Sequence, residues 1–259
     1  MQNSQVKSAS RAIRILEYFM TIRQPRAMSD IAAALKYPQS SCTVLLKTLV
    51  NLGYLNFDRR ERVYFPTPKV TSLGEWIPSA LFGASRVVDA MRDVHAATGE
   101  TVSICARNDV YVQYIQIIQS VHALRFHVDE GTLRPLTRSA LGWTLLSTLP
   151  DDKIDNIVRR ANIATDTIAD RVSVGAMMER VRQIRKSGYC FAENIPFLGG
   201  GTLCVLLPVM VQNQAVALGL GGAAERIRLN HDRYLAILRR AVKAVKPADS
   251  LDQPSGVDI

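Results

Sequence analysis

Residues 37 to 55, YPQSSCTVLLKTLVNLGYL, carry two different faces at helical spacing. One face is an apolar stripe made by Cys42, Leu45, Leu46, Leu49 and Leu52. The other is small, polar or basic, with Ser40, Thr43, Lys47 and Asn51. Short polar side chains at a helix start let its backbone approach phosphate groups, and a lysine adds a further phosphate contact. The pattern therefore predicts a helix that packs through its stripe and enters a DNA major groove with its polar face.

The segments on either side supply the support that such a helix needs. Before it, the apolar spacing predicts a helix over about residues 8–22, and SDIAAALK predicts a short second helix with Ser29 as its N-cap. After it, Gly53 is expected to end the helix, and YLNFDRRERVYFPT predicts two strands around a charged hairpin tip. Helix, helix, turn, helix and two-stranded ribbon, in that order, indicate a winged helix-turn-helix.

Basic residues are concentrated in this part of the chain. Residues 1–73 carry 11 Lys and Arg against 4 Asp and Glu, whereas the remainder carries 21 against 19. This excess favours a polyanionic partner. Arg59, Arg60 and Arg62, at the expected hairpin tip, would reach flanking phosphates or a minor groove. Two alternatives to DNA binding stay open, because winged helices also serve in dimerisation and a polar helix face is often only solvated.

A second domain is expected after a linker at TPKVTSL. Its pattern begins with a helix over about 75–97, two strands around a turn at 108–109 and a third strand at HALRFHV. Three helices, three strands and a final helix over about 230–245 follow. Mostly antiparallel strands with helices in separate runs indicate an α+β sensor-like domain. The tail from Pro247 is rich in Pro, Asp and Ser and is expected to fray.

Several other kinds of chemistry find little support in the sequence. The four cysteines form no CxxC pair and lie in apolar surroundings, which indicates buried thiols. The four histidines show no metal-binding spacing, and the glycines of FLGGGTL precede a strand and lack the Lys-Ser or Lys-Thr pair of a phosphate loop. No stretch approaches the roughly 20 apolar residues of a membrane span, and no signal-peptide run opens the chain. We therefore expect a cytoplasmic protein without a metal or cofactor.

An enzyme remains the alternative to a DNA-binding regulator. A methyltransferase that uses S-adenosylmethionine, for example, could employ the winged helix as a dimerisation module. Such an enzyme needs a Gly-rich turn between a strand and a helix, and GLGGAAERI is the sole candidate. This stretch lies too near the C-terminus for the βαβ unit that must follow it, and no Ser-His-Asp or Cys-His set is evident.

Several segments together resemble the IclR family of bacterial transcriptional regulators. YPQSSCTVLLKTLVNLGYL matches the family pattern LPxSTVxRLLxTLxxxGYL, and LRPLTRSALGWTLLSTLP is similar to a family segment built on LPLHATALGKALLA. RQIRKSGYCFAENIPFLGGGTLCVLLPV is similar to RGYAxDxEExxPGxxCIAAPV. The resemblance covers roughly residues 8–246. It implies an α+β chain in which a winged helix-turn-helix at 1–73 is joined by a linker helix at 74–98 to a GAF-like α/β effector-binding domain at 99–247, with a flexible tail at 248–259.

The resemblance also implies a function and the residues for DNA contact. Members are homodimers, often dimers of dimers, that bind a pseudo-palindromic operator and respond to a small organic or aromatic acid, often a catabolite. By position in the matched motif, DNA contact falls on Gln39, Ser40, Ser41 and Thr43, beside Ser29, Lys47 and the hairpin arginines. The family often has a basic or His-Arg pair where this chain has Thr43 and Val44, so recognition here is expected to depend more on phosphates and the wing.

For the effector, the resemblance implies a second set of residues: Phe126, Ser139, Ala140, Leu141, Asn194, Cys204, Gly219 and Gly221. Ser139 and Ala140 begin a helix whose N–H groups suit a carboxylate. The family commonly has serines at positions 219 and 221, which predicts a larger or more apolar ligand than a two- or three-carbon acid. Arg138 stands where the family usually has a small residue, and it would either pair with the acid bidentately or remain a solvated surface residue.

Overall fold

The computed structural model describes residues 6–77, 80, 86–165 and 170–245. The chain divides into two compact units, residues 1–80 and 81–259. The tail expected at 248–259 lies outside the described residues. Each unit has its own buried apolar cluster, as an independent domain requires.

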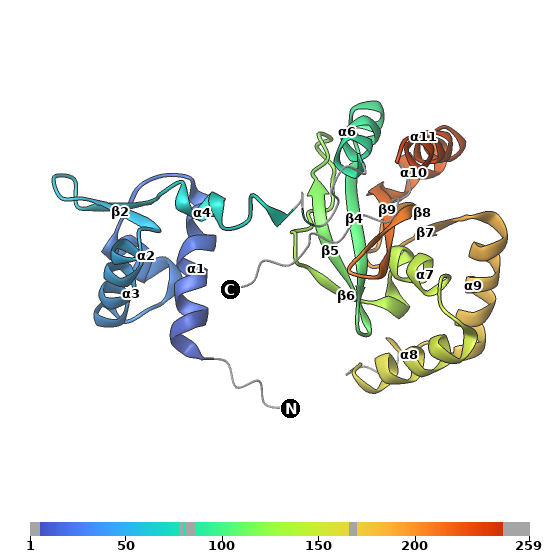
Figure 1. Cartoon of the computed structure of the whole chain (residues 1–259), viewed down its shortest axis with the longest axis horizontal. Coiled ribbons are helices and arrows are strands. Elements are labelled where there is room, and N and C mark those ends of the chain that lie inside the picture. Colours follow the sequence, from blue (N-terminus) through green and yellow to red (C-terminus); the bar gives the residue numbers. More distant parts are fainter. Residues whose placement is uncertain (1–5, 78–79, 81–85, 166–169, 246–259) are drawn as a thin grey trace, which may run out of the picture. The chain divides into compact units, whose positions relative to one another are not determined.

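The N-terminal unit contains three helices around one core (Figure 1). They are α1 (Lys7–Ile22), α2 (Met28–Leu35) and α3 (Gln39–Asn51). Cys42, Leu46 and Leu49 are buried on α3 as predicted, with Leu45 half-buried, but Leu52, the last residue of the predicted stripe, lies just past the helix end and is 53% exposed. Gly53 has a φ of 79°, a left-handed conformation that costs glycine little, and it ends this helix as expected.

Three short strands complete this unit: β1 (Arg26–Ala27), β2 (Leu55–Asp58) and β3 (Val63–Pro66). They form one antiparallel sheet in the order β1-β3-β2, and the β2–β3 hairpin is the predicted wing. A single turn of helix, α4 (Lys69–Ser72), follows. The predicted winged helix-turn-helix is therefore present.

The start of the second helix differs from the prediction. The N-cap of α2 is Ala27, whose side chain cannot accept a hydrogen bond, and Ser29 is an exposed residue inside the helix. The pairing of β1 with β3 fixes Arg26 and Ala27 in extended conformation, so the sheet sets the helix start and no side-chain cap is formed. Asp30 lies in the first turn, where a negative charge is favourable.

The linker segment is not one continuous helix in the described residues. Residues 73–76 form a turn, and α6 (Val87–Thr98) begins after Arg86, whose φ is 58°. An α-helix cannot pass through such a left-handed residue, so α6 starts at Val87 and is separate from the helical residues Ile77 and Ala80. The expected apolar positions Leu81 and Ala84 lie outside the described residues.

The second unit is built on a six-stranded antiparallel sheet with the strand order β6-β5-β4-β9-β8-β7. The strands are β4 (Thr101–Asn108), β5 (Tyr111–Ile118), β6 (Leu133–Pro135), β7 (Tyr189–Glu193), β8 (Gly200–Val211) and β9 (Gln214–Ala223). The third strand predicted at HALRFHV is wrong, because residues 122–128 form bends and coil. The strand that does pair with this edge of β5 is the later segment β6, which joins Tyr111–Gln113.

Helices cover both faces of this sheet (Figure 1). On one face lie α6, α10 (Ala224–Leu229) and α11 (His231–Ala244). On the other lie α7 (Ala140–Leu146), α8 (Asp151–Ile163) and α9 (Val174–Ser187). A 3-10 turn at Leu136–Arg138 leads into α7. Side chains along β4 and β9 alternate between the two faces of the sheet, so buried residues of each strand contribute to both apolar clusters.

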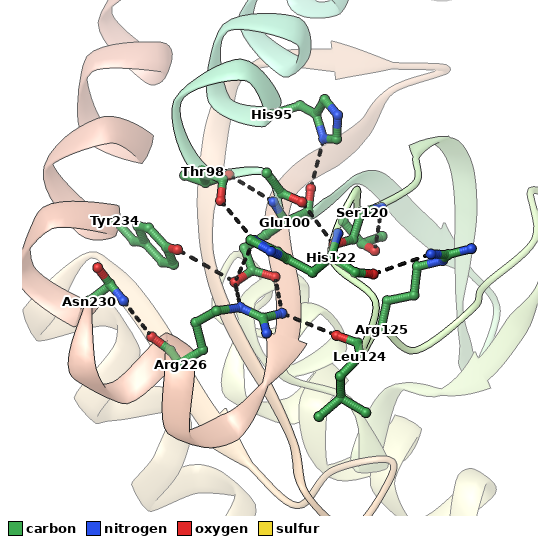
Figure 2. Close-up of polar contacts among 12 residues, drawn as sticks. His95, Thr98, Glu100, Ser120, His122, Leu124, Arg125, Arg226, Asn230 and Tyr234 are labelled. Atoms are coloured by element: carbon green, nitrogen blue, oxygen red, sulfur yellow. Dashed lines mark hydrogen bonds and ion pairs between the residues drawn. The ribbon is translucent and has the colours of Figure 1, made fainter.

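The junction between α6 and β4 is held by a buried carboxylate, Glu100 (Figure 2). Arg226 of α10 forms an ion pair with it through two guanidinium nitrogens, one of which, Nη2, lies 2.8 Å from Oε2. Tyr234 of α11 donates to Oε1 at 3.5 Å, and Nε2 of His122 lies 3.8 Å from that oxygen. Glu100 thereby joins the end of α6, the loop after β5 and both C-terminal helices.

Removal of the Arg226 charge should destabilise the protein strongly. Arg226→Met leaves the fully buried Glu100 carboxylate without a cation, which typically costs about 3–5 kcal/mol. The matched control is Arg228→Met, since Arg228 pairs with Glu193 at 2.8 Å but with its own side chain 60% exposed. That pair should contribute at most about 1 kcal/mol. Urea unfolding of both variants measures the difference, and an equal destabilisation would show that the Glu100 pair has no special role in stability.

Candidate DNA-binding surface and ligand pocket

The polar face of α3 is turned to solvent. Gln39, Ser40 and Lys47 are exposed, and Ser41 and Thr43 are half-buried. Five of the residues predicted for DNA contact thus share the side of α3 that the core leaves uncovered. Ser29, on α2, is exposed as well.

Two details of this face were not anticipated from the sequence. The Thr43 hydroxyl donates to the Gln39 carbonyl oxygen at 2.9 Å, so a base acceptor must compete with this bond. Val44 is 64% exposed beside Thr43. A valine methyl is the kind of group that makes apolar contact with the 5-methyl group of thymine, so this face carries an exposed apolar side chain besides its polar ones.

The wing tip presents the three predicted arginines. Arg59, Arg60 and Arg62 are all exposed. The Asp58 carboxylate accepts hydrogen bonds from the backbone N–H groups of Arg60, at 2.8 Å, and Glu61, at 3.0 Å. This Asx-type turn fixes the hairpin tip, so the backbone that carries the arginines is ordered by local bonds.

The second unit contains a pocket on the α7 side of the sheet. Its floor is a row of three residues paired across adjacent strands, Thr202 of β8, Gly221 of β9 and Thr101 of β4. Because Gly221 has no side chain, the middle of this row is open. The space inside is about 50 Å³, room for a compact ligand or a few waters.

The pocket walls combine apolar groups with a small number of polar ones. The apolar lining is Phe126, Val128, Leu141, Ile195, Pro196, Phe197 and Leu220. The polar side chains are the hydroxyls of Thr101, Ser103, Tyr114 and Thr202, and the guanidinium of Arg134. Burial raises the pKa of Tyr114, so its phenol stays neutral and can donate a hydrogen bond. Few convergent polar groups in an apolar hollow are typical of small-molecule sites.

Arg134, on the edge strand β6, is the basic group of this pocket. Its guanidinium carbon lies 4.7 Å from the ring centre of Phe197 and 5.7 Å from that of Tyr114. Phe197 in turn stacks on Phe126, with ring centres 5.6 Å apart and an interplanar angle of 7°. The Nε atom of Arg134 is buried and has no hydrogen-bond partner among the described residues. The pocket therefore contains a positioned cation with a donor that is available to a ligand.

Three of the residues predicted for the effector line this pocket, namely Phe126, Leu141 and Gly221. Gly219 does not, because the Leu141 side chain occupies its space: an added Cβ would lie 2.8 Å from Leu141 Cδ2. Of the two glycines expected to enlarge the site, only Gly221 leaves room in it.

The other predicted effector residues have local partners. Arg138 forms an ion pair with Asp170. Ser139 is the buried N-cap of α7 and accepts from Gly142 N at 3.4 Å, while Ala140 is buried in the first turn. Asn194 Oδ1 accepts from Gly199 N at 2.8 Å and closes the loop before β8. None of the four belongs to the lining of the pocket.

Cys204 of β8 is buried, and its Sγ atom lies 3.1 Å from the Thr144 hydroxyl oxygen. Burial raises the pKa of its thiol, which keeps it protonated and unreactive. All four cysteines are buried and free of disulfides, in agreement with the sequence. Sequence reasoning missed Arg134, Tyr114 and Phe197, for which strand periodicity gives no functional signal.

Two wider hollows, of about 420 and 540 Å³, hold none of the predicted effector residues. Within the described parts of the chain, no three His, Cys, Asp or Glu side chains are grouped to hold a metal ion. None of the helices described there has both the length and the apolar character needed to cross a membrane.

Known proteins resemble this chain over nearly its whole length. Residues 8–59 match the IclR helix-turn-helix domain, and residues 84–247 match the C-terminal domain of IclR-type bacterial transcriptional regulators. The HTH-type transcriptional regulator KdgR of Escherichia coli strain K12 is 25% identical over 251 residues, which cover 94% of each chain.

Solved structures extend the likeness to the fold. The effector domain of a putative IclR transcriptional regulator from Acinetobacter sp. ADP1 is 55% identical to 66% of this chain, with a TM-score of 0.62, and 99% of that domain is covered. The IclR protein of Thermotoga maritima is 17% identical and shares the fold over 93% of this chain and 97% of its own, with a TM-score of 0.74.

These matches exclude the methyltransferase alternative, because they place both units in a family of non-enzymatic proteins that bind operator DNA and small effectors. The chain belongs to the IclR family of bacterial transcriptional regulators.

Proposed function

We propose that this regulator controls a catabolic operon in response to a small organic or aromatic acid. The observation that carries the proposal is the Arg134 cation in the pocket of the second unit, whose Nε has no partner among the described residues. A half-buried cation with its Nε enclosed beside apolar walls suits a ligand with a carboxylate and a compact apolar body. An acid that is a metabolite of the enzymes encoded by the operon would link the expression of those enzymes to its own supply.

Contact with DNA is assigned to the exposed face of α3 and to the wing. Gln39, Ser40, Ser41, Thr43 and Lys47 offer hydrogen bonds and charge on one helix side, and Ser29 lies on the preceding helix α2. In a helix-turn-helix the second helix of the motif enters the major groove, where such short side chains reach base edges and phosphates. Arg59, Arg60 and Arg62 would extend the contact along the backbone or into a minor groove.

A homodimer fits this mode of binding. One α3 reads only a few base pairs, so a two-fold pair of chains would read two half-sites of a pseudo-palindrome about one helical turn apart. Such an assembly doubles the number of phosphate contacts and with it the salt dependence of binding.

Selection of fragmented genomic DNA by the purified full-length chain, at physiological salt and followed by sequencing, tests the proposed function. We expect enrichment of a small set of pseudo-palindromic sites next to genes for catabolic enzymes. Addition of the pathway's acid should then change occupancy of those sites. Uniform recovery of DNA without a shared site would contradict specific regulation.

Two substitutions on α3 should separate phosphate contact from base recognition. Lys47→Ala should weaken binding on every DNA sequence and reduce the slope of log affinity against log salt by about one unit, since one phosphate is no longer neutralised. Thr43→Ala should instead change the preferred base at one position of each half-site.

Fluorescence anisotropy on operator and scrambled duplexes at several salt concentrations measures both effects. Lys186→Ala is the matched control, because Lys186 is an exposed lysine near the end of α9 in the other unit. If Lys47→Ala behaved like this control, the assignment of α3 to the groove would be incorrect.

A further inference from the structure

We infer that Arg134 is the residue that determines effector specificity, and that it selects a compact acid with a single negative charge. The inference rests on the proposed function, since it concerns the ligand of the same pocket. It assigns the carboxylate to Arg134 and the remaining body of the ligand to the aromatic wall of Phe126 and Phe197. A dicarboxylate and a neutral amide of the same shape are both excluded.

The charge of Arg134 is not balanced within the described residues. Nearby arginines are paired, Arg138 with Asp170 and Arg226 with Glu100, whereas Arg134 forms no ion pair in the described part of the chain. Its Nε is buried and has no acceptor there. A buried N–H donor without an acceptor is costly, and a ligand carboxylate oxygen removes that cost.

The surroundings of Arg134 also fix its direction. The guanidinium lies over the rings of Phe197 and Tyr114, and these cation–π contacts restrain it while its Nε has no acceptor in the described part of the chain. Nε and one terminal nitrogen form the fork that binds both oxygens of a carboxylate. The stacked rings of Phe126 and Phe197 provide an apolar face beside this fork for the ligand body.

The far wall of the pocket argues against a second charge. That wall includes Gly222, and the Glu100 carboxylate lies directly behind it: a Cβ on Gly222 would be 2.2 Å from Glu100 Oε2. The nearest cation there, Arg226, is already held by Glu100. At this end a second ligand carboxylate would find the neutral hydroxyls of Thr101, Ser103 and Thr202 but no cation free to pair with it among the described lining residues. Those hydroxyls suit a neutral polar group, such as a hydroxyl or keto group.

Two matched series of probes test the inference with the full-length chain. The four-carbon series is butyrate, butyramide and succinate, and the aromatic series is benzoate, benzamide and isophthalate. Isothermal titration calorimetry gives the affinity of each. In at least one series, the monocarboxylate should bind about tenfold or more tightly than its amide and its diacid, because it alone satisfies Arg134 without adding a second charge.

Arg134→Gln should reduce monocarboxylate affinity about tenfold or more and abolish the preference over the amide. Arg138→Gln is the matched control and should keep both, because Arg138 does not line the pocket. Arg134→Lys should restore part of the preference, since it keeps the charge but lacks the fork. Circular dichroism melting of each variant verifies that the fold is intact.

Four results would overturn the inference: a diacid as the tightest ligand, an amide equal to its acid, unchanged acid binding by Arg134→Gln, or no binding by any of the six probes. Failure of the proposed function is distinguishable from these results. If the proposed function is wrong, the unmodified chain will select no operator, an experiment that needs no effector probe. If only this inference is wrong, the unmodified chain will still select its operator. Arg134→Gln should select the same operator in either of the two cases in which the unmodified chain does.

Discussion

The ion pair between Glu100 and Arg226 is the interaction on which the second unit depends. A fully buried carboxylate is stable only with a cation and hydrogen bonds around it. Glu100 therefore requires Arg226, Tyr234 and His122 to lie close to it. It also dictates the residue on β9, because any side chain at position 222 would collide with it. One charge thus fixes the packing of α10 and α11 against the start of β4.

The same constraint shapes the pocket on the other side of the sheet. With glycine at 221 and 222, β9 has bare backbone between the Glu100 network on one face and the ligand space on the other. The wall between the two is therefore a single strand thick. Any ligand that presses on Gly221 acts on backbone whose neighbour touches Glu100, and Glu100 lies two residues after the end of α6. The floor of the pocket is therefore adjacent to the residues that hold the end of α6.

Periodicity predicted the three helices of the N-terminal unit and the wing because burial largely determines them, whereas the helix predicted over 75–97 is interrupted at Arg86. The stripe of Cys42, Leu46 and Leu49 had to face a core, and it does. The predictions of the N-cap of α2 and of the basic residue in the pocket failed because both depend on partners distant in sequence. Ser29 has the chemistry of an N-cap, but pairing of β1 with β3 places Ala27 there. Arg138 and Arg134 lie in one short segment, LRPLTR, and nothing in the sequence tells which finds a carboxylate: Asp170 takes the first, and the position of β6 turns the second toward the pocket.

The two proposed ligands are both anions, yet the protein would bind them by different physics. The side chains assigned to DNA, Lys47 and the wing arginines, are exposed, so their attraction is screened by salt and acts over a Debye length of about 8 Å at physiological ionic strength. The Nε of Arg134 is buried between aromatic rings, where screening is weak and the cost of leaving it unpaired is high. We therefore expect added salt to lower the affinity for the operator far more than the affinity for the acid.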